Sequence, residues 1–123
     1  MKVYIVRHGE VLHNALKIYN NENEDLNDNG LKQAEMLKSK IKDLEYDMII
    51  SSPLIRAKHT AEIINVKNKD ILIDNRLEER NPGDLSGQPL EVTNREEYWN
   101  YYTEIQYGTS ENIQEFFKRI YNF

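Results

Sequence analysis

The hydrophobic pattern in the first third of the chain predicts a strand followed by a helix. Residues 2–6 alternate in polarity and are rich in β-branched side chains, which is typical of a strand. Residues 19–29 are polar and predict a loop. Asn27 or Asp28 is a candidate N-cap, because apolar residues recur at helical spacing after it. These apolar positions are Leu31, Ala34, Met36, Leu37 and Ile41.

The pattern then continues as strand, helix and strand. Residues 46–50 end in three apolar side chains, as in a strand buried on both faces. Ser51 or Ser52 is expected to cap a helix that has Pro53 in its first turn. The buried face of that helix is expected to contain Ala57, Ala61 and Ile64. Residues 71–73 predict a third strand, and this alternation favours βαβ units with a largely parallel sheet.

The last third predicts a loop over residues 80–92 and helices near 94–106 and 110–122. The first of these helices is rich in aromatic residues. For it we expect packing in the core or as a lid, since too few cations are interleaved for a base-stacking platform. Its large side chains are Tyr98, Trp99, Tyr101, Tyr102, Ile105 and Tyr107. The length of 123 residues and the absence of an internal repeat predict a single domain over residues 1–123.

Composition narrows the classes of function. The net charge is −5 and there is no block of lysine or arginine, so we expect no nucleic-acid groove. An anionic substrate must then be held by a few local arginines. The chain has no cysteine, which excludes disulfides and thiol chemistry and fits a cytoplasmic protein. We expect no signal peptide and no membrane span, since no apolar run approaches about 18 residues.

Three chemically active clusters follow the predicted strands: Arg7-His8, residues 51–56 and residues 77–87. The carboxyl ends of parallel strands share one edge of a sheet, so these clusters are expected to converge. An imidazole can attack phosphorus, and two arginines can hold the phosphoryl group between them. Arg56, in the first turn of its helix, also gains from the helix dipole. Glu79 can protonate the leaving oxygen, although Glu78-Glu79-Arg80 is also compatible with a solvated charge run.

Four motifs in order resemble the histidine phosphatase superfamily, the phosphoglycerate mutase-like proteins. The first is Arg7-His8-Gly9-Glu10 with Asn14. The second consists of Leu26, Gly30, Gln33 and Ala34. The third consists of Ser51-Ser52-Pro53-Leu54, Arg56-Ala57 and Thr60-Ala61. The fourth consists of Leu77, Glu79-Arg80, Gly83 and Gly87.

This resemblance implies an α/β fold of three layers, α/β/α, with a mainly parallel sheet. It implies a phosphohistidine on His8, whose other ring nitrogen is held by a backbone carbonyl near Gly9, and an acid–base role for Glu79. The implied catalytic residues are His8, Glu79, Arg7 and Arg56. The implied substrate-binding residues are Arg7, Gly9, Glu10, Asn14 and Arg56. No cofactor and no metal are implied.

The chain departs from the family pattern most clearly in its histidines. The family pocket holds a second histidine on a later strand that lies between the first two strands of the sheet. His13 and His59 do not stand in such a motif and are expected to be structural or exposed. The chain therefore resembles a family fold truncated before that histidine. The first two strands must then pair directly, or a second chain must fill the gap, which favours a homodimer or strand-exchanged oligomer.

We expect a phosphatase acting on a small phosphorylated metabolite, with weak activity because the second histidine is missing. A phosphoglycerate mutase-type transferase is the less favoured enzyme, because it needs more cationic groups near the site than this acidic chain is expected to supply. The alternative from another class of function is a binding protein: a catalytically degenerate member of the family that binds phosphorylated ligands or a partner subunit without turnover.

Overall fold

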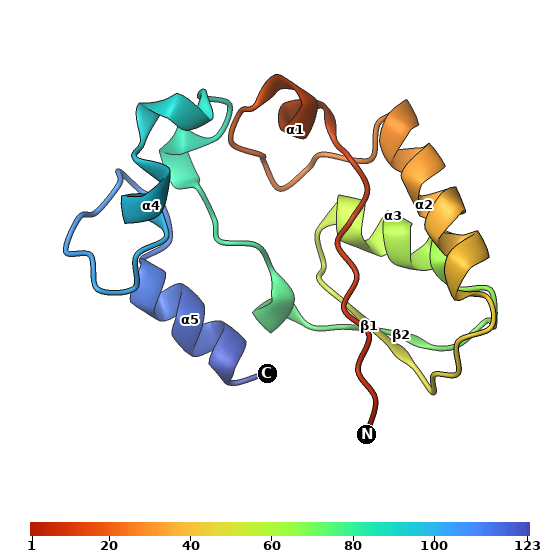
Figure 1. Cartoon of the computed structure of the whole chain (residues 1–123). Helices are drawn as coiled ribbons and strands as arrows, with labels where there is room; N and C mark the ends of the chain where they lie inside the picture. Colours follow the sequence, from red (N-terminus) through yellow and green to blue (C-terminus); the bar gives the residue numbers. More distant parts are fainter.

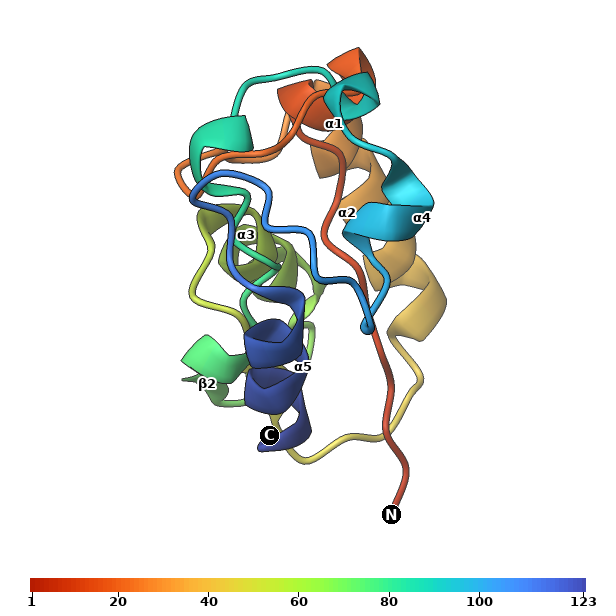
Figure 2. The same cartoon turned by 90° about the vertical axis from the view of Figure 1, so that its left-hand side faces the viewer.

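The computed structural model describes all residues 1–123. The elements in chain order are α1 (Leu12–Leu16), α2 (Asp28–Ile41), β1 (Ile49–Ser51), α3 (Ile55–Ile64), β2 (Ile71–Ile73), α4 (Arg95–Tyr98) and α5 (Ile113–Tyr121). Figures 1 and 2 place α4 and α5 on the opposite side of the molecule from α2 and α3. None of the helices combines the length and apolar character needed to cross a membrane.

β1 and β2 form a parallel pair, connected through α3, as the βαβ prediction requires. Ile49 pairs with Ile71, and the register continues to Ser51 opposite Ile73. β2 lies where the sequence predicts it. β1 begins three residues later than predicted, and the prediction that it is buried on both faces is wrong, because Ile50 is exposed.

Residues 2–6 do not form a strand, so this prediction is wrong. An apolar cavity of about 710 Å³ separates this segment from β1, and no strand in the chain supplies the hydrogen-bonding partner that a ladder needs. We call this space the apolar cavity. Its lining includes Val3, Ile5, Ile49, Ile50, Ile64 and Phe123. Of the two alternatives for the first two predicted strands, direct pairing is therefore not observed, and Figure 1 shows the N-terminal segment passing the strands unpaired.

α2 matches its prediction closely. Asn27 is the N-cap, and its side chain accepts a hydrogen bond from the Gly30 N–H at 2.8 Å. Of the helically spaced apolar residues, Ala34 is buried, whereas Met36 is 62% exposed. α2 packs against α3, so the two helices form one layer beside the strands.

α3 begins later than the sequence suggests. Its N-cap is Leu54, which makes no side-chain cap, so the prediction of a serine N-cap is wrong. Ser52 instead accepts a hydrogen bond from the Leu54 N–H at 3.3 Å and closes the turn before the helix. Ala61 and Ile64 are buried as predicted, and Arg56 lies in the first turn.

The residue after His8 is positioned by both α2 and α3. A side chain at Gly9 would clash with the carbonyl group of Gly30, and one at Gly30 would clash with the backbone of Glu10. The Gly9 N–H also donates to the Thr60 hydroxyl at 3.2 Å. This close approach, which only glycine allows, fixes the exit of the N-terminal segment against the helical layer.

The predicted helix over 94–106 is only one turn long, because α4 ends at Tyr98. After Tyr98, the Asn100 side chain accepts a hydrogen bond from the Tyr102 N–H at 3.0 Å. This hydrogen bond closes a turn that competes with continuation of the helix. Tyr98 is 1% exposed and packs against the rings of Tyr19, Trp99 and Tyr107, as expected for a core role. α5 lies within the range predicted for the last helix.

Candidate functional site

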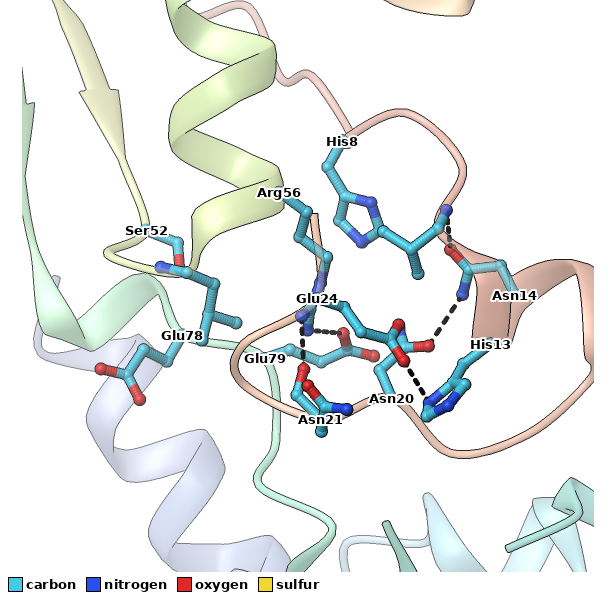
Figure 3. A network of polar contacts seen from close by, with 12 residues as sticks. His8, His13, Asn14, Asn20, Asn21, Glu24, Ser52, Arg56, Glu78 and Glu79 are labelled. Atoms are coloured by element: carbon cyan, nitrogen blue, oxygen red, sulfur yellow. Dashed lines mark hydrogen bonds and ion pairs between the residues drawn. The ribbon is translucent and has the colours of Figure 1, made fainter. Parts of the chain in front are cut away.

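Arg56 and Glu79 meet in the structure although they lie 23 positions apart (Figure 3). The Arg56 Nη2 donates to the Glu79 carboxylate at 3.0 Å, and Nη1 donates to the Asn21 carbonyl at 2.8 Å. The Arg56 side chain is only 3% exposed, and its buried Nε has no hydrogen-bond partner. A buried N–H donor without an acceptor is costly, so this nitrogen is suited to receive an oxygen from a ligand.

His8 lies beside Arg56 at the exit of the N-terminal segment (Figure 3). Its Nδ1 is 2.6 Å from the Gly9 carbonyl oxygen. A carbonyl only accepts, so Nδ1 donates and Nε2 carries the free lone pair. Burial is the largest influence and lowers the pKa of His8, with Arg56 and Arg7 acting in the same direction and Gly9 and Glu79 opposing it. The neutral, nucleophilic form of the imidazole is therefore favoured at neutral pH.

Two cavities meet at this cluster. One is the apolar cavity, which His8 lines. The other, which we call the polar cavity, has a volume of about 590 Å³ and extends toward α4. Both cavities are lined by Arg7, Leu54, Arg56 and Glu79. The basic groups expected to hold a phosphoryl group therefore stand where the two cavities join.

The structure distinguishes the two neighbouring acids that the sequence leaves open. Glu79 contacts Arg56, whereas the Glu78 carboxylate points away from it in Figure 3. The backbone carbonyl of Glu78 accepts from Arg119 at 2.8 Å. Glu79 is therefore the acid next to His8 and Arg56, and its role in proton transfer stays a prediction.

The remaining predicted site residues are placed differently. Asn14 lines the polar cavity, and its amide also bonds the Val11 N–H and the Asn20 side chain, each at 3.3 Å. Gly9 and Glu10 line neither cavity. The Glu10 carboxylate accepts from the Asn27 side chain at 2.9 Å and so joins the N-terminal segment to α2. Substrate contact by Gly9 and Glu10 stays a prediction.

The two other histidines pair with acids of the loop that also supplies the Asn21 carbonyl to Arg56. His13 pairs with Glu24, and His59 Nδ1 lies 2.8 Å from the Asp25 carboxylate. Burial raises the pKa of Glu24, partly offset by His13 and Arg56, and its Oε2 has no partner. The sequence indicated only a polar loop here. It did not indicate that the loop carries the Asn21 carbonyl to Arg56.

Sequence reasoning also missed two arginines. Arg80 and Arg95 line the polar cavity together with Arg7 and Arg56. The expectation of few cationic groups, which disfavoured a mutase, is therefore wrong. The available signals were that Arg80 directly follows Glu79 and that Arg95 begins the aromatic-rich segment. No group of three or more histidine or acidic side chains is arranged to hold a metal ion, and metal-independent chemistry stays a prediction.

Comparisons with known proteins agree with this geometry. Residues 3–123 match the family model of the histidine phosphatase superfamily (branch 1). The chain is 40% identical over 93 residues to the fructose-2,6-bisphosphatase TIGAR of Xenopus tropicalis, which covers 70% of this chain and 34% of that protein. It is 36% identical over 102 residues to a Yersinia pestis protein named probable phosphoglycerate mutase GpmB, which covers 80% of this chain and 47% of that protein.

A similar solved structure is the alpha-ribazole phosphatase from Shigella flexneri, with a TM-score of 0.81 and 25% identity. The match covers 95% of this chain and 62% of that one. The chain thus spans between a third and two thirds of the length of these relatives. The order of the motifs, the contact of His8 with Gly9, the pairing of Arg56 with Glu79 and the matched family model agree, and the chain belongs to the histidine phosphatase superfamily.

Proposed function

We propose that this chain hydrolyses phosphomonoesters through a phosphohistidine formed on His8. The observation that carries the proposal is the contact between His8 Nδ1 and the Gly9 carbonyl, beside a buried Arg56 with a free Nε. This contact leaves Nε2 as the nucleophile and fixes the plane of the ring. The lowered pKa of His8 keeps the nitrogen unprotonated at neutral pH.

The proposed reaction has two steps. Nε2 attacks phosphorus, the bond from phosphorus to the ester oxygen breaks, and that oxygen takes a proton from Glu79. Water then attacks the phosphohistidine, with Glu79 taking a proton, and releases inorganic phosphate. Arg7 and Arg56 neutralise the phosphoryl oxygens. Phosphate oxygens compete with Glu79 for Arg56, which frees the carboxyl group for proton transfer.

The substrate class follows from the family and its named members. One relative is named for the hydrolysis of fructose 2,6-bisphosphate and another for a phosphoglycerate mutase, so we infer a small phosphorylated metabolite. We propose hydrolysis rather than transfer of the phosphoryl group. The four arginines that line the polar cavity nevertheless remove the argument that the site has too few cationic groups for a mutase. No second histidine lines either cavity. Because the loss of one preorganised hydrogen-bond donor typically lowers the rate by about 10²–10³, we expect slow turnover.

The test is single-turnover labelling with a ³²P-labelled aryl phosphate, together with steady-state hydrolysis of p-nitrophenyl phosphate. We expect the wild-type chain to acquire an acid-labile, base-stable phosphoryl label. His8→Ala should abolish both the label and hydrolysis. His59→Ala is the matched control, because its imidazole lines neither cavity and its ion pair with Asp25 is exposed enough to contribute little to stability. Labelling or turnover of His8→Ala at the wild-type level would overturn the mechanism.

A second candidate function is the binding of phosphorylated ligands without turnover, as in a catalytically degenerate member of the family. The observation that favours it is the cavity beside His8, whose lining is mostly apolar. Phosphate binding that is lost in Arg56→Gln, without a phosphoenzyme at high protein concentration, would select this candidate.

A further inference from the structure

Gly9 bears the carbonyl that holds Nδ1 of His8, yet a glycine does not by itself fix the direction of its carbonyl. Only glycine fits at this position, because a Cβ there would clash with the Gly30 carbonyl group. A residue without a side chain has unusually free φ and ψ angles. Residues 2–8 belong to no helix or strand, so no regular backbone pairing restrains the segment that leads into Gly9. The two peptide groups on either side of Gly9 must therefore be held by other bonds.

The peptide group before Gly9 is held by Thr60 of α3. The Gly9 N–H donates to the Thr60 hydroxyl at 3.2 Å, and this hydroxyl donates to the Arg56 carbonyl at 2.8 Å. Since its only proton points to Arg56, the hydroxyl oxygen faces Gly9 as an acceptor. Thr60 is 3% exposed, so this pair of hydrogen bonds is shielded from water. One hydroxyl thus connects the backbone beside His8 with the backbone of Arg56.

The peptide group after Gly9 is held by Gln33 of α2. This group contains both the Gly9 carbonyl and the Glu10 N–H, and the Glu10 N–H donates to Gln33 Oε1 at 2.8 Å. On the opposite side of the same group, the Gly9 carbonyl accepts from His8 Nδ1. Hydrogen bonds at both ends of one peptide group polarise each other, so the bond to Gln33 strengthens the acceptor that faces the imidazole.

We infer that Thr60 and Gln33 are positioning residues for His8: they fix the two peptide groups around Gly9 and so set the tautomer and the orientation of the imidazole. Both act through the backbone of Gly9. The inference rests on the proposed function, in which Nε2 of His8 is the nucleophile. It assigns to α2 and α3 a part in preparing that nucleophile, in addition to packing against each other.

The test for Thr60 compares Thr60→Val and Thr60→Ser with the wild-type chain. Long-range ¹H–¹⁵N NMR of the His8 ring reports its tautomer and its pKa without any turnover. The wild-type neutral ring should carry its proton on Nδ1. Thr60→Val keeps the shape of the side chain but leaves the buried Gly9 N–H without an acceptor. It should move the ring toward the Nε2–H tautomer and slow single-turnover labelling by about tenfold or more.

The pKa of His8 gives a second readout. The Gly9 carbonyl raises this pKa, so a misaligned carbonyl should lower it further in Thr60→Val. The charged groups that act on the ring are Arg7, Arg56 and Glu79, and the substitution alters none of them. Thr60→Ser retains the hydroxyl and should keep the wild-type tautomer, pKa and labelling rate.

Gln33→Ala should change the same three quantities in the same direction, but less. Its hydrogen bond to the Glu10 N–H is exposed, so water partly replaces it, and we expect labelling to slow by about two- to fivefold. Asn29→Ala is the matched control. It removes an exposed amide side chain from the same helix without breaking a hydrogen bond to residues 8–10, and it should leave all three quantities unchanged.

The wild-type tautomer and pKa of His8 in Thr60→Val, or in Gln33→Ala, would overturn the inference for that residue. A loss in Thr60→Val that Thr60→Ser does not restore would also overturn it, because packing and not the hydroxyl would then be responsible. If the wild-type chain acquires no phosphoryl label, the proposed function fails. The NMR measurement then still decides whether Thr60 and Gln33 control the ring.

Discussion

The environment of His8 determines which form of its imidazole is present at a given pH. The ring is half-buried and lies near two arginines, which disfavours the imidazolium. The Gly9 carbonyl and Glu79 favour it, but burial is the largest influence. The result is a pKa below the ordinary value of 6.5, so protonation of the nucleophile requires an acidic solution.

This direction predicts the pH dependence of phosphoenzyme formation. The midpoint of the fall in labelling rate with decreasing pH should lie below 6.5, because burial lowers the pKa of His8 and protonation of Nε2 removes the attacking lone pair. The measurement is single-turnover labelling at a series of pH values, with the ionisation of the substrate determined separately. A midpoint above 6.5 would show that the Gly9 carbonyl and Glu79 together outweigh burial.

Sequence reasoning recovered one part of the site better than the other. His8, Arg56 and Glu79 converge because each follows a segment that runs through or beside the sheet, and their order in the chain reveals this. Arg80 and Arg95 come near each other because both guanidinium groups lie close to the buried ring of Tyr98, at 3.9 and 5.9 Å from its centre. No periodicity in the sequence encodes a contact of that kind.

Among the elements, those with strong local signals lie where the sequence predicts them. α2 has an N-cap and a helical repeat, and β2 is a short β-branched run. The segment over 94–106 has a helical repeat as well, but Asn100 diverts its backbone into a turn. Residues 2–6 have the composition of a strand, yet a strand exists only when a neighbour pairs with it. That condition is not contained in the segment itself.

The cap of α2 gives a prediction about stability. Asn27→Ala should lower the free energy of unfolding by about 1–2 kcal/mol, because it removes the acceptor for the Gly30 N–H and also the donor to Glu10. Urea denaturation measures this change. Asn29→Ala is the control, since Asn29 is exposed within the first turn and makes no such bond, and it should be neutral or slightly stabilising. Equal effects of the two substitutions would contradict the role of Asn27 as a cap.

At the scale of the whole molecule, much apolar surface lies open. Ile5 is 94% exposed, and it lines the apolar cavity together with the exposed Val3 and Ile50. Beside it, β1 presents backbone groups that pair on one edge only, with β2. Open apolar surface next to an unpaired strand edge favours association with another chain.

We therefore propose that the chain forms a homodimer or larger oligomer. Light scattering should give a mass above 14.6 kDa that rises with protein concentration. Ile5→Lys should shift the equilibrium toward the monomer, because it places a charge in the apolar cavity. Met36→Lys adds the same charge at an exposed position on α2 outside the cavity and should leave the mass unchanged. A monomer at every concentration would overturn this proposal.

The open apolar cavity also affects how much of the protein accumulates inside a cell. Chaperones and proteases recognise exposed apolar side chains, and a difference of 1–2 kcal/mol in stability can change abundance several-fold. The steady-state amount of this chain should then depend on how quickly the face between residues 3–6 and β1 becomes covered after synthesis. Substitutions there would alter the amount of the protein in the cell without changing the residues around His8.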